Sequence, residues 1–242
     1  MASRGAALVT GGARRIGRAL VATAAEAGYD VAIHVRTMDE EAESAAGEVR
    51  AHGRKATILT CDLRKESESV ALIGQAEAEL GPVTLLINSA SVFENDAFAD
   101  MNRHSWDLHM ETNLRAPLVL AQVFARRLPA DREGLIVNLL DQRVLRPAPD
   151  FFSYSLSKSA LWDATRRLAQ ALAPRIRVNA IGPGPVLASI HQDAAAFEAE
   201  ARSTLLQRPA PPAQIAAALR YLIDATAVTG QMIAVDSGQH LA

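Results

Sequence analysis

Short apolar runs alternate with longer amphipathic stretches along most of the chain. Nearly continuous apolar runs are typical of parallel strands that are covered by helices on both faces. The pattern predicts seven strands, at residues 6–10, 30–36, 55–62, 83–88, 134–140, 176–181 and 231–236. Strict β-α-β alternation implies right-handed crossovers, so we expect an α/β fold with a doubly wound parallel sheet of about seven strands.

Helical stretches lie between these strands, and the first ends at Gly28, a plausible C-cap. Residues 183–212 depart from the pattern, because proline-rich pieces flank a polar, alanine-rich helical piece. An insertion after the carboxyl end of a strand usually lies over the ligand crevice. With no flexible linker to separate two cores, we expect one domain spanning residues 1–242, with a substrate lid at about 183–212.

Composition and charge exclude several classes of protein. The formal net charge is −2, so no basic field favours nucleic acid or an anionic membrane as a partner. A single cysteine, Cys61, rules out an intrachain disulfide and fits a reducing compartment. The first residues lack the apolar core of a signal peptide, and no apolar run is long enough to span a membrane. We expect a cytoplasmic protein.

A glycine-rich turn, TGGARRIG at residues 10–17, follows the first strand and opens the first helix. Gly11 allows a tight turn, and Gly17 allows the helix to approach its neighbours closely. The helix N-terminus then offers free N–H groups and a positive dipole end to a pyrophosphate. The position of this turn between strand and helix predicts a dinucleotide site.

The end of the second strand indicates which dinucleotide is bound. An acidic residue there would bind a ribose 2′-hydroxyl, whereas an arginine accommodates a 2′-phosphate. The chain has Arg36 and Thr37 at this point, and the guanidinium and hydroxyl favour NADPH over NADH. The alternative for Arg36 is a solvated loop residue. Asp62 closes the third strand, where it could accept a hydrogen bond from the adenine amino group or cap the next helix.

Tyr154 and Lys158 are four residues apart in a predicted helix, which places both on one face. A tyrosine hydroxyl has an ordinary pKa near 10, and a nearby ammonium group stabilises the phenolate. The pair is therefore a candidate for proton transfer at neutral pH. The alternative is a partly buried tyrosine near a surface lysine.

These motifs together resemble the short-chain dehydrogenase/reductase family, whose fold is of the Rossmann type. The resemblance extends over almost the whole chain, through TGGARRIG, CDL (61–63), INSA (87–90), NAIGPG (179–184) and VTGQMIAVDSG (228–238). It implies catalytic roles for three residues: Tyr154 donates the proton, Lys158 binds the nicotinamide ribose, and Asn113 holds a water of the proton relay. It also implies that the cofactor contacts a larger set, namely Gly11, Arg15, Ile16, Gly17, Arg36, Thr37, Asp62, Leu63, Asn88, Ala90, Tyr154, Lys158 and Gly184.

The chain departs from the family at the catalytic serine, because that place after the fifth strand holds Asp141. An ionised carboxylate repels an oxyanion, but a carboxyl group can pass a proton to a ring nitrogen. This Asp resembles that of the pteridine reductases, which have Asp, Tyr and Lys at the same spacing. That branch also has an arginine at the place of Arg15, near the pyrophosphate and the pterin, and it implies that Ser91 binds the pterin and Phe93 stacks on it.

The resemblance therefore implies hydride transfer from NADPH to a C=N carbon of a dihydropterin, with Asp141 and Tyr154 supplying the proton. Two alternatives remain: an NADPH-dependent reductase of a ketone, a quinone or another imine, and a catalytically silent NADPH-binding sensor.

Because His104 and His109 lack partners at metal-ligand spacing, we expect no metal site. Family members are often tetramers that pair through the helices after the fourth and fifth strands, so a homotetramer is expected.

Overall fold

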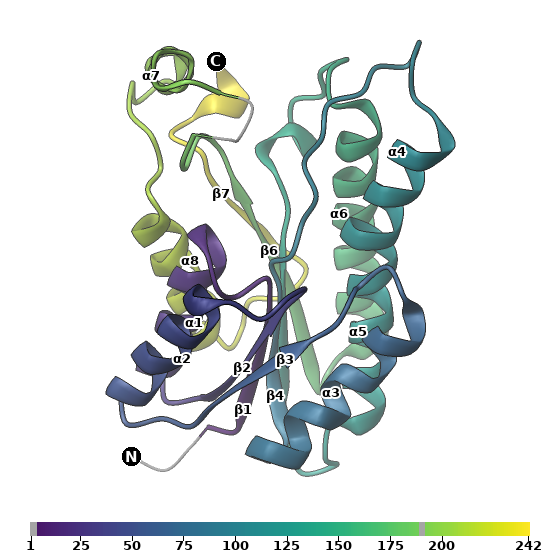
Figure 1. The fold of residues 1–242 in the computed structure, drawn as a ribbon, viewed down its shortest axis with the longest axis vertical. Coiled ribbons are helices and arrows are strands. Elements are labelled where there is room, and N and C mark those ends of the chain that lie inside the picture. The colour runs from purple at the N-terminus through teal and green to yellow at the C-terminus, as the bar shows by residue number, and fades with distance from the viewer. Residues whose placement is uncertain (1–3, 189–191) are drawn as a thin grey trace.

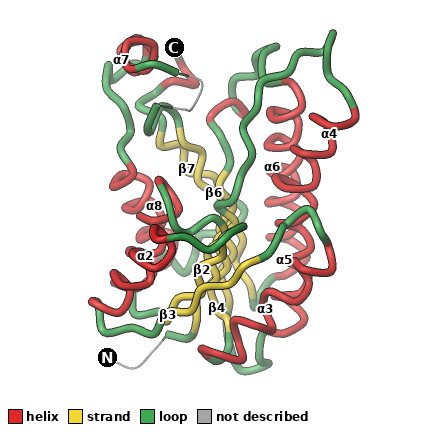
Figure 2. The backbone as a smooth tube through the Cα atoms, in the orientation of Figure 1, coloured by secondary structure: helices red, strands yellow, loops and turns green. Residues whose placement is uncertain are grey.

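The computed structural model describes residues 4–188 and 192–242. Its centre is a seven-stranded, all-parallel sheet with the strand order β3-β2-β1-β4-β5-β6-β7, which confirms the predicted doubly wound sheet. Figure 2 shows the strands between two layers of helices. The strands are β1 (Ala6–Thr10), β2 (Asp30–Val35), β3 (Ala56–Thr60), β4 (Val83–Asn88), β5 (Gly134–Leu139), β6 (Ile176–Pro183) and β7 (Met232–Val235).

Helices cover both faces of this sheet (Figure 1). One face carries α1 (Arg15–Glu26), α2 (Glu40–Ala51) and α8 (Pro212–Asp224). The other carries α3 (Glu66–Leu80), α4 (Arg103–His109), α5 (Ala116–Arg127) and α6 (Phe152–Leu172). None of the described helices is both long and apolar enough to cross a membrane.

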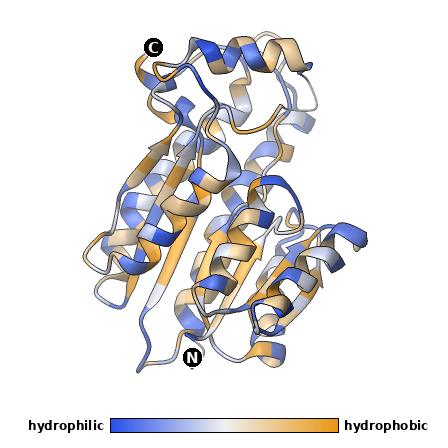
Figure 3. Cartoon of the chain, turned by 90° about the vertical axis from the view of Figure 1, so that its left-hand side faces the viewer, coloured by the Kyte–Doolittle hydropathy of each residue, from blue (hydrophilic) through white to orange (hydrophobic). Residues whose placement is uncertain are grey.

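The central strands are buried along their whole length, because helices pack on both of their faces. Every residue of β1, β2, β4 and β5 is buried. Figure 3 shows the apolar strands beneath helices whose outer faces are hydrophilic. The strand order reverses between β1 and β4, and ligands of open α/β sheets bind in the crevice outside the carboxyl ends at such a point. The fold therefore places its binding crevice beyond Thr10 and Asn88.

Five predicted strands differ from the structure at one or both ends, and strand pairing explains the two ends that differ by two residues. We expected a strand at 55–62, but β3 ends at Thr60, because its only neighbour β2 ends at Val35, the partner of Thr60. We expected another strand to end at residue 181, but β6 continues to Pro183, which lies opposite Val235 of β7.

The region between β4 and β5 is less regular than its sequence suggests. Residues 89–102 form an irregular loop, hereafter the β4–α4 loop, and the helical part begins only at Arg103. A π-helical segment, Met110–Arg115, joins α4 to α5. Within the expected lid, α7 (Ala194–Ser203) provides the helical piece, whereas residues 189–191 of that lid lie outside the described residues.

Candidate active site

Two adjoining cavities lie at the carboxyl end of the sheet. The first, of about 410 Å³, runs from the turn after β1 to the ends of β2 and β3. The second, of about 630 Å³, lies over β5, β6 and the N-terminal half of α6. Arg15, Ile16, Ser89 and Ser91 line both, so the two cavities meet at the start of α1.

The glycine-rich turn leaves no room for side chains between β1 and α1. Gly11 has φ of +64°, and a Cβ atom on Gly17 would lie 2.0 Å from the carbonyl oxygen of Gly11. The N-cap residue Arg14 forms no side-chain capping bond, and the first turn of α1 holds no acidic residue. The free N–H groups of this helix end face the first cavity, an arrangement that fits a pyrophosphate.

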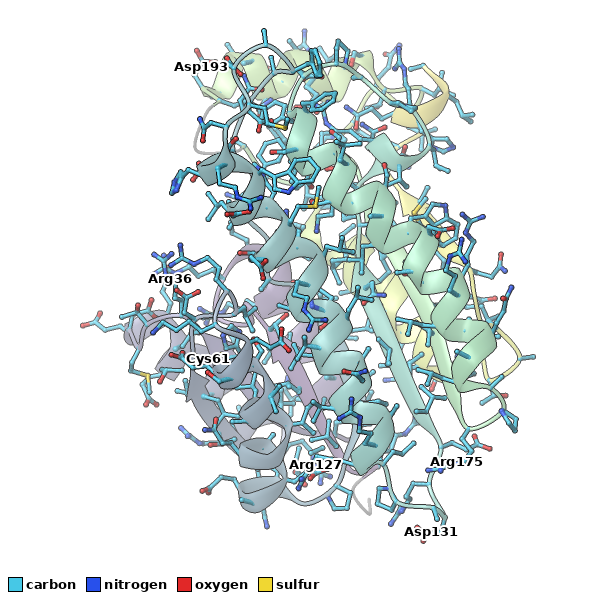
Figure 4. The ribbon with its side chains drawn as sticks, turned by 90° about the vertical axis from the view of Figure 1, so that its right-hand side faces the viewer. Arg36, Cys61, Arg127, Asp131, Arg175 and Asp193 are labelled. Carbon is cyan, nitrogen blue, oxygen red and sulfur yellow. The ribbon has the colours of Figure 1, made fainter. Side chains whose placement is uncertain are left out.

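Cations gather at the far end of the first cavity, where Arg14, Arg36 and Arg64 line its wall. Figure 4 shows Arg36 on the same side of the molecule as Cys61, which follows β3. Arg14 pairs with Asp39, and Arg64 pairs with Asp62. Arg36 has no ion-pair partner among the described residues. The guanidinium of Arg36 is therefore available to an additional phosphate.

Asp62 lies in the wall of this cavity and does not cap the next helix. Its carboxylate accepts hydrogen bonds from the guanidinium and the backbone N–H of Arg64, while the N-cap residue of α3 is Lys65. The side-chain bond from Arg64 holds the pKa of Asp62 at about 2. Asp62 is therefore an ionised acceptor at neutral pH.

The second cavity holds Tyr154, Asp141 and Lys158. The hydroxyl of Tyr154 donates a hydrogen bond of 2.8 Å to Oδ2 of Asp141, and the backbone N–H of Arg143 donates to Oδ1. Nζ of Lys158, one turn further along α6, lies 5.7 Å from the centre of the Tyr154 ring. This ammonium group donates to the carbonyl oxygen of Leu139.

Burial changes the acidity of all three groups. It raises the pKa of Asp141, although the N–H of Arg143 and the Tyr154 hydroxyl oppose it. Burial and the Asp141 carboxylate raise the pKa of Tyr154 well above its ordinary value. Burial lowers the pKa of Lys158 to about 8, despite the opposing field of Asp141. At neutral pH the site therefore holds a protonated tyrosine, a charged lysine and a carboxyl group that accepts a proton more readily than usual.

An aromatic stack forms one wall of the second cavity. Phe93 of the β4–α4 loop stacks on Phe151 with ring centres 4.2 Å apart and meets the Tyr154 ring edge-on at 4.7 Å. The guanidinium of Arg143 lies 5.1 Å from the centre of the Phe151 ring and is paired with Asp150. Phe151 therefore covers one face of Phe93 and fixes the plane of its ring.

Asn113 lies in the π-helical segment, where its side chain is fully buried. Its Oδ1 accepts from the N–H of Val92 and from the Ser91 hydroxyl, and its Nδ2 donates to the carbonyl oxygen of Val92 and to the Ser157 hydroxyl. Asn113 thus ties the β4–α4 loop to α6 behind the cavity wall.

Arg15 connects the start of α1 to the expected lid. It adopts a left-handed backbone conformation, with φ of +51°. Its guanidinium donates to the carbonyl oxygens of Leu187 and Ala188 at 3.1 and 3.0 Å. Arg15 therefore lies between the two cavities and binds the segment after β6 at Leu187 and Ala188.

Most residues predicted for the site line the two cavities, namely Gly11, Arg15, Ile16, Gly17, Arg36, Asp62, Leu63, Ala90, Ser91, Phe93, Asp141, Tyr154, Lys158 and Gly184. Three do not line them. Thr37 is exposed beside the first cavity, Asn113 lies behind the wall, and Asn88 is buried with its Nδ2 donating to Oδ1 of Asn138. The sequence interpretation missed Arg143 and Phe151. They lie two residues after Asp141 and three before Tyr154, a proximity that could have revealed them.

Comparisons with known proteins agree with this fold. The family described as short chain dehydrogenase matches residues 5–199. The structure of FolM Alternative dihydrofolate reductase 1 from Brucella suis in complex with NADP superposes with a TM-score of 0.95 and 46% identity, covering 100% of this chain and 97% of that one. A short chain dehydrogenase from Burkholderia cenocepacia in complex with NADP has a TM-score of 0.91 and 28% identity, with 98% of each chain covered. The relative 3-oxoacyl-(acyl-carrier-protein) reductase FabG from Staphylococcus epidermidis is 28% identical over 243 residues, which covers 97% of this chain and 98% of the relative.

Proposed function

The chain belongs to the short-chain dehydrogenase family and is an NADP(H)-dependent oxidoreductase, and we propose that within this family it reduces a C=N bond of a pterin. The observation that carries the proposal is the hydrogen bond from Tyr154 to Asp141, in the place where other members of the family have a serine. The resemblance to the Brucella suis protein, named for dihydrofolate reduction, supports the same substrate class.

The proposed reaction adds a hydride to carbon and a proton to nitrogen, which converts a dihydropterin to a tetrahydropterin. NADPH supplies the hydride when bound. Tyr154 is protonated at neutral pH and donates its proton to the ring nitrogen. Asp141 is 2.8 Å from the tyrosine oxygen, and its raised pKa lets it take up a proton from solvent and pass it to Tyr154.

The remaining residues bind and orient the reactants. Lys158 holds the nicotinamide ribose, and its positive charge limits the cost of the developing phenolate on Tyr154. Arg36, with Thr37 beside it, binds the 2′-phosphate, and Asp62 accepts from the adenine amino group. The dinucleotide lies against a surface formed by Gly11, Ile16, Gly17, Leu63, Ala90 and Gly184. Asn88 and Asn113 support that surface from behind.

The pterin would lie flat against the face of Phe93 that Phe151 leaves uncovered, with Ser91 and Arg15 beside it. Stacking on an aromatic face suits a planar heterocycle and holds its C=N bond near Tyr154.

Residues 183–212 act as the lid of this cavity within a domain that spans residues 1–242. The chain assembles as a homotetramer through α5 and α6, which light scattering of the purified protein tests.

One rival function has an observation in its favour. The likeness to the FabG relative, a 3-oxoacyl reductase by name, supports a carbonyl substrate. An ionised Asp141 opposes that reaction, since it would repel the oxyanion that forms on a reduced ketone. A catalytically silent sensor is less compatible with the retained Tyr154 and Lys158 pair.

The substrate class is tested by following NADPH oxidation with the purified protein. Dihydrobiopterin and dihydromonapterin are compared with a ketone, a quinone and a 3-oxoacyl thioester under the same conditions. Turnover confined to the pterins is expected. Turnover of the thioester or the ketone, with silence toward both pterins and retained NADPH binding, would establish the rival function.

A further inference from the structure

A buried His-Ser-Asp chain lies next to the proposed site and takes no part in the proposed chemistry. Nδ1 of His109 is 2.7 Å from the hydroxyl of Ser153, which donates a short 2.5 Å hydrogen bond to Oδ2 of Asp96. The side chains of His109 and Ser153 are fully buried, and Asp96 is only 7% exposed. The chain connects α4, α6 and the β4–α4 loop.

The hydrogen bonds determine which nitrogen of His109 carries the proton. The backbone N–H of Glu94 donates to Nε2 at 3.2 Å, so Nε2 must be an unprotonated acceptor. The hydroxyl of Ser153 already donates to Asp96, so Nδ1 must be the donor in its bond with Ser153. The network is therefore complete only when the imidazole is neutral. A second proton would place an N–H group against the N–H of Glu94.

This network holds the segment that presents the proposed substrate residues. Glu94 follows Phe93 directly, and Asp96 also accepts from the backbone N–H of Ser153, at the start of α6. Ser153 precedes Tyr154, and the centre of the His109 ring is 6.0 Å from the centre of the Tyr154 ring. Loosening the contact at Glu94 would free the Phe93 ring without touching the glycine-rich turn that faces the other cavity.

We propose that His109 is a positioning residue whose neutral imidazole holds the β4–α4 loop against α6, and that its protonation weakens substrate binding while leaving NADPH binding intact. The effect on substrate rests on the proposed function, because it depends on Phe93 contacting the substrate. The dependence of the β4–α4 loop on the neutral ring of His109 does not depend on which substrate is bound.

The surroundings of His109 place this change on the acid side of neutrality. Burial lowers the pKa of His109, and the charge of Lys158 on α6 acts in the same direction. Asp96 and Glu94 from the loop and the backbone at Ser105 of α4 oppose this effect without reversing it. Because its pKa is lowered, the ring of His109 is neutral at and above the ordinary histidine pKa of about 6.5, and the neutral form is lost only as the pH falls through a pKa below that value.

The test compares two substitutions on the same short helix, His109→Gln and His104→Gln. A glutamine at 109 can accept from the N–H of Glu94 but does not titrate, whereas His104 is exposed and serves as the matched control. Between pH 7.5 and pH 5.5, we expect the KM for dihydropterin to rise in the wild type and in His104→Gln by about fivefold or more relative to its change in His109→Gln. A fivefold rise corresponds to about 1 kcal/mol of lost binding. The KM for NADPH is expected to follow one pH profile in all three proteins. Identical substrate profiles for wild type and His109→Gln would overturn the proposal.

Two measurements on the wild-type NADP complex need neither substrate nor a stable variant. The ¹⁵N shifts of the His109 ring at pH 7.5 are expected to show the neutral tautomer protonated on Nδ1, and a charged ring or the other tautomer would overturn the assignment. Amide exchange of residues 92–98, corrected for the intrinsic rate, is expected to lose protection as the pH falls. If pterins are not turned over at all, the proposed function fails, while these two readouts still decide the role of His109.

Discussion

The hydroxyl of Tyr154 donates a 2.8 Å hydrogen bond to Oδ2 of Asp141, although the two residues belong to different elements. Tyr154 lies in the first turn of α6, and Asp141 follows β5 as the N-cap of a short 3-10 turn. The pair joins a proton donor to a carboxyl group of raised pKa in one cavity. This arrangement can deliver a proton to a basic nitrogen but is a poor environment for an oxyanion.

Replacing Asp141 by asparagine is expected to lower kcat for dihydropterin reduction by about 100-fold, because a positioned proton donor contributes at least that much to rate. Asparagine has the same shape, so its Oδ1 can accept from the N–H of Arg143 while its Nδ2, which replaces Oδ2, donates to the Tyr154 oxygen. The dissociation constant of NADPH, measured by its fluorescence, is expected to stay within twofold of the wild type. An undiminished kcat would remove the role assigned to Asp141.

The same substitution is expected to stabilise the fold at neutral pH. Because burial raises the pKa of Asp141, the folded protein loses stability as the pH rises through that pKa and the buried carboxyl group ionises. Asp141→Asn removes this cost, so its free energy of unfolding at pH 7 should exceed that of the wild type. Urea unfolding at a series of pH values should show the difference shrinking toward pH 4. A variant less stable than the wild type at pH 7 would contradict this account.

Arg36 is expected to determine the preference for NADPH over NADH. Charge-assisted hydrogen bonds are worth about 1.5–3 kcal/mol, so Arg36→Ala should raise the KM for NADPH by about 10- to 100-fold. The KM for NADH should change little, because NADH lacks the 2′-phosphate. Arg50→Ala, on the exposed side of α2, provides the control. Equal losses with both cofactors would show that Arg36 does not read the phosphate.

Phe93→Leu is expected to weaken binding of the planar substrate, because an aromatic stack contributes about 0.5–1.5 kcal/mol beyond its buried area. The KM for dihydropterin should therefore rise by about 2- to 10-fold, with no change in the KM for NADPH. Phe98→Leu is the matched control, since this aromatic lies in the same loop and is 77% exposed. If both variants behave alike, the loop and not the Phe93 ring is responsible.

The order of the elements and the polypeptide turn around Gly11 could be predicted because both depend on local patterns. The apolar runs of β1 and β4 require burial on both faces, and Gly17 meets the backbone of Gly11 closely. Strand ends were less predictable, since the length of β3 depends on where its neighbour β2 ends.

The features that escaped prediction depend on contacts between distant segments. Phe151 supports Phe93 from 58 positions further along the chain, and nothing in the letters near either residue indicates that stack. The His109, Ser153 and Asp96 network similarly joins three elements. In the sequence, His109 has no partner at metal-ligand spacing, so it is assigned no role there. Its hydrogen-bond partners, Ser153 and Glu94, are brought to it by the fold.

The central claim, reduction of a pterin C=N bond at the Tyr154 and Asp141 pair, is tested most directly by tracing the transferred hydrogen. Purified wild-type protein is given NADPH deuterated at nicotinamide C4 and a 7,8-dihydropterin, and the product is examined by NMR. The account predicts deuterium on the ring carbon bonded to the newly protonated nitrogen, and a transfer about 100-fold slower in Asp141→Asn with NADPH still bound. Absence of deuterium from the pterin, with label appearing instead in the alcohol from a ketone substrate, would contradict it.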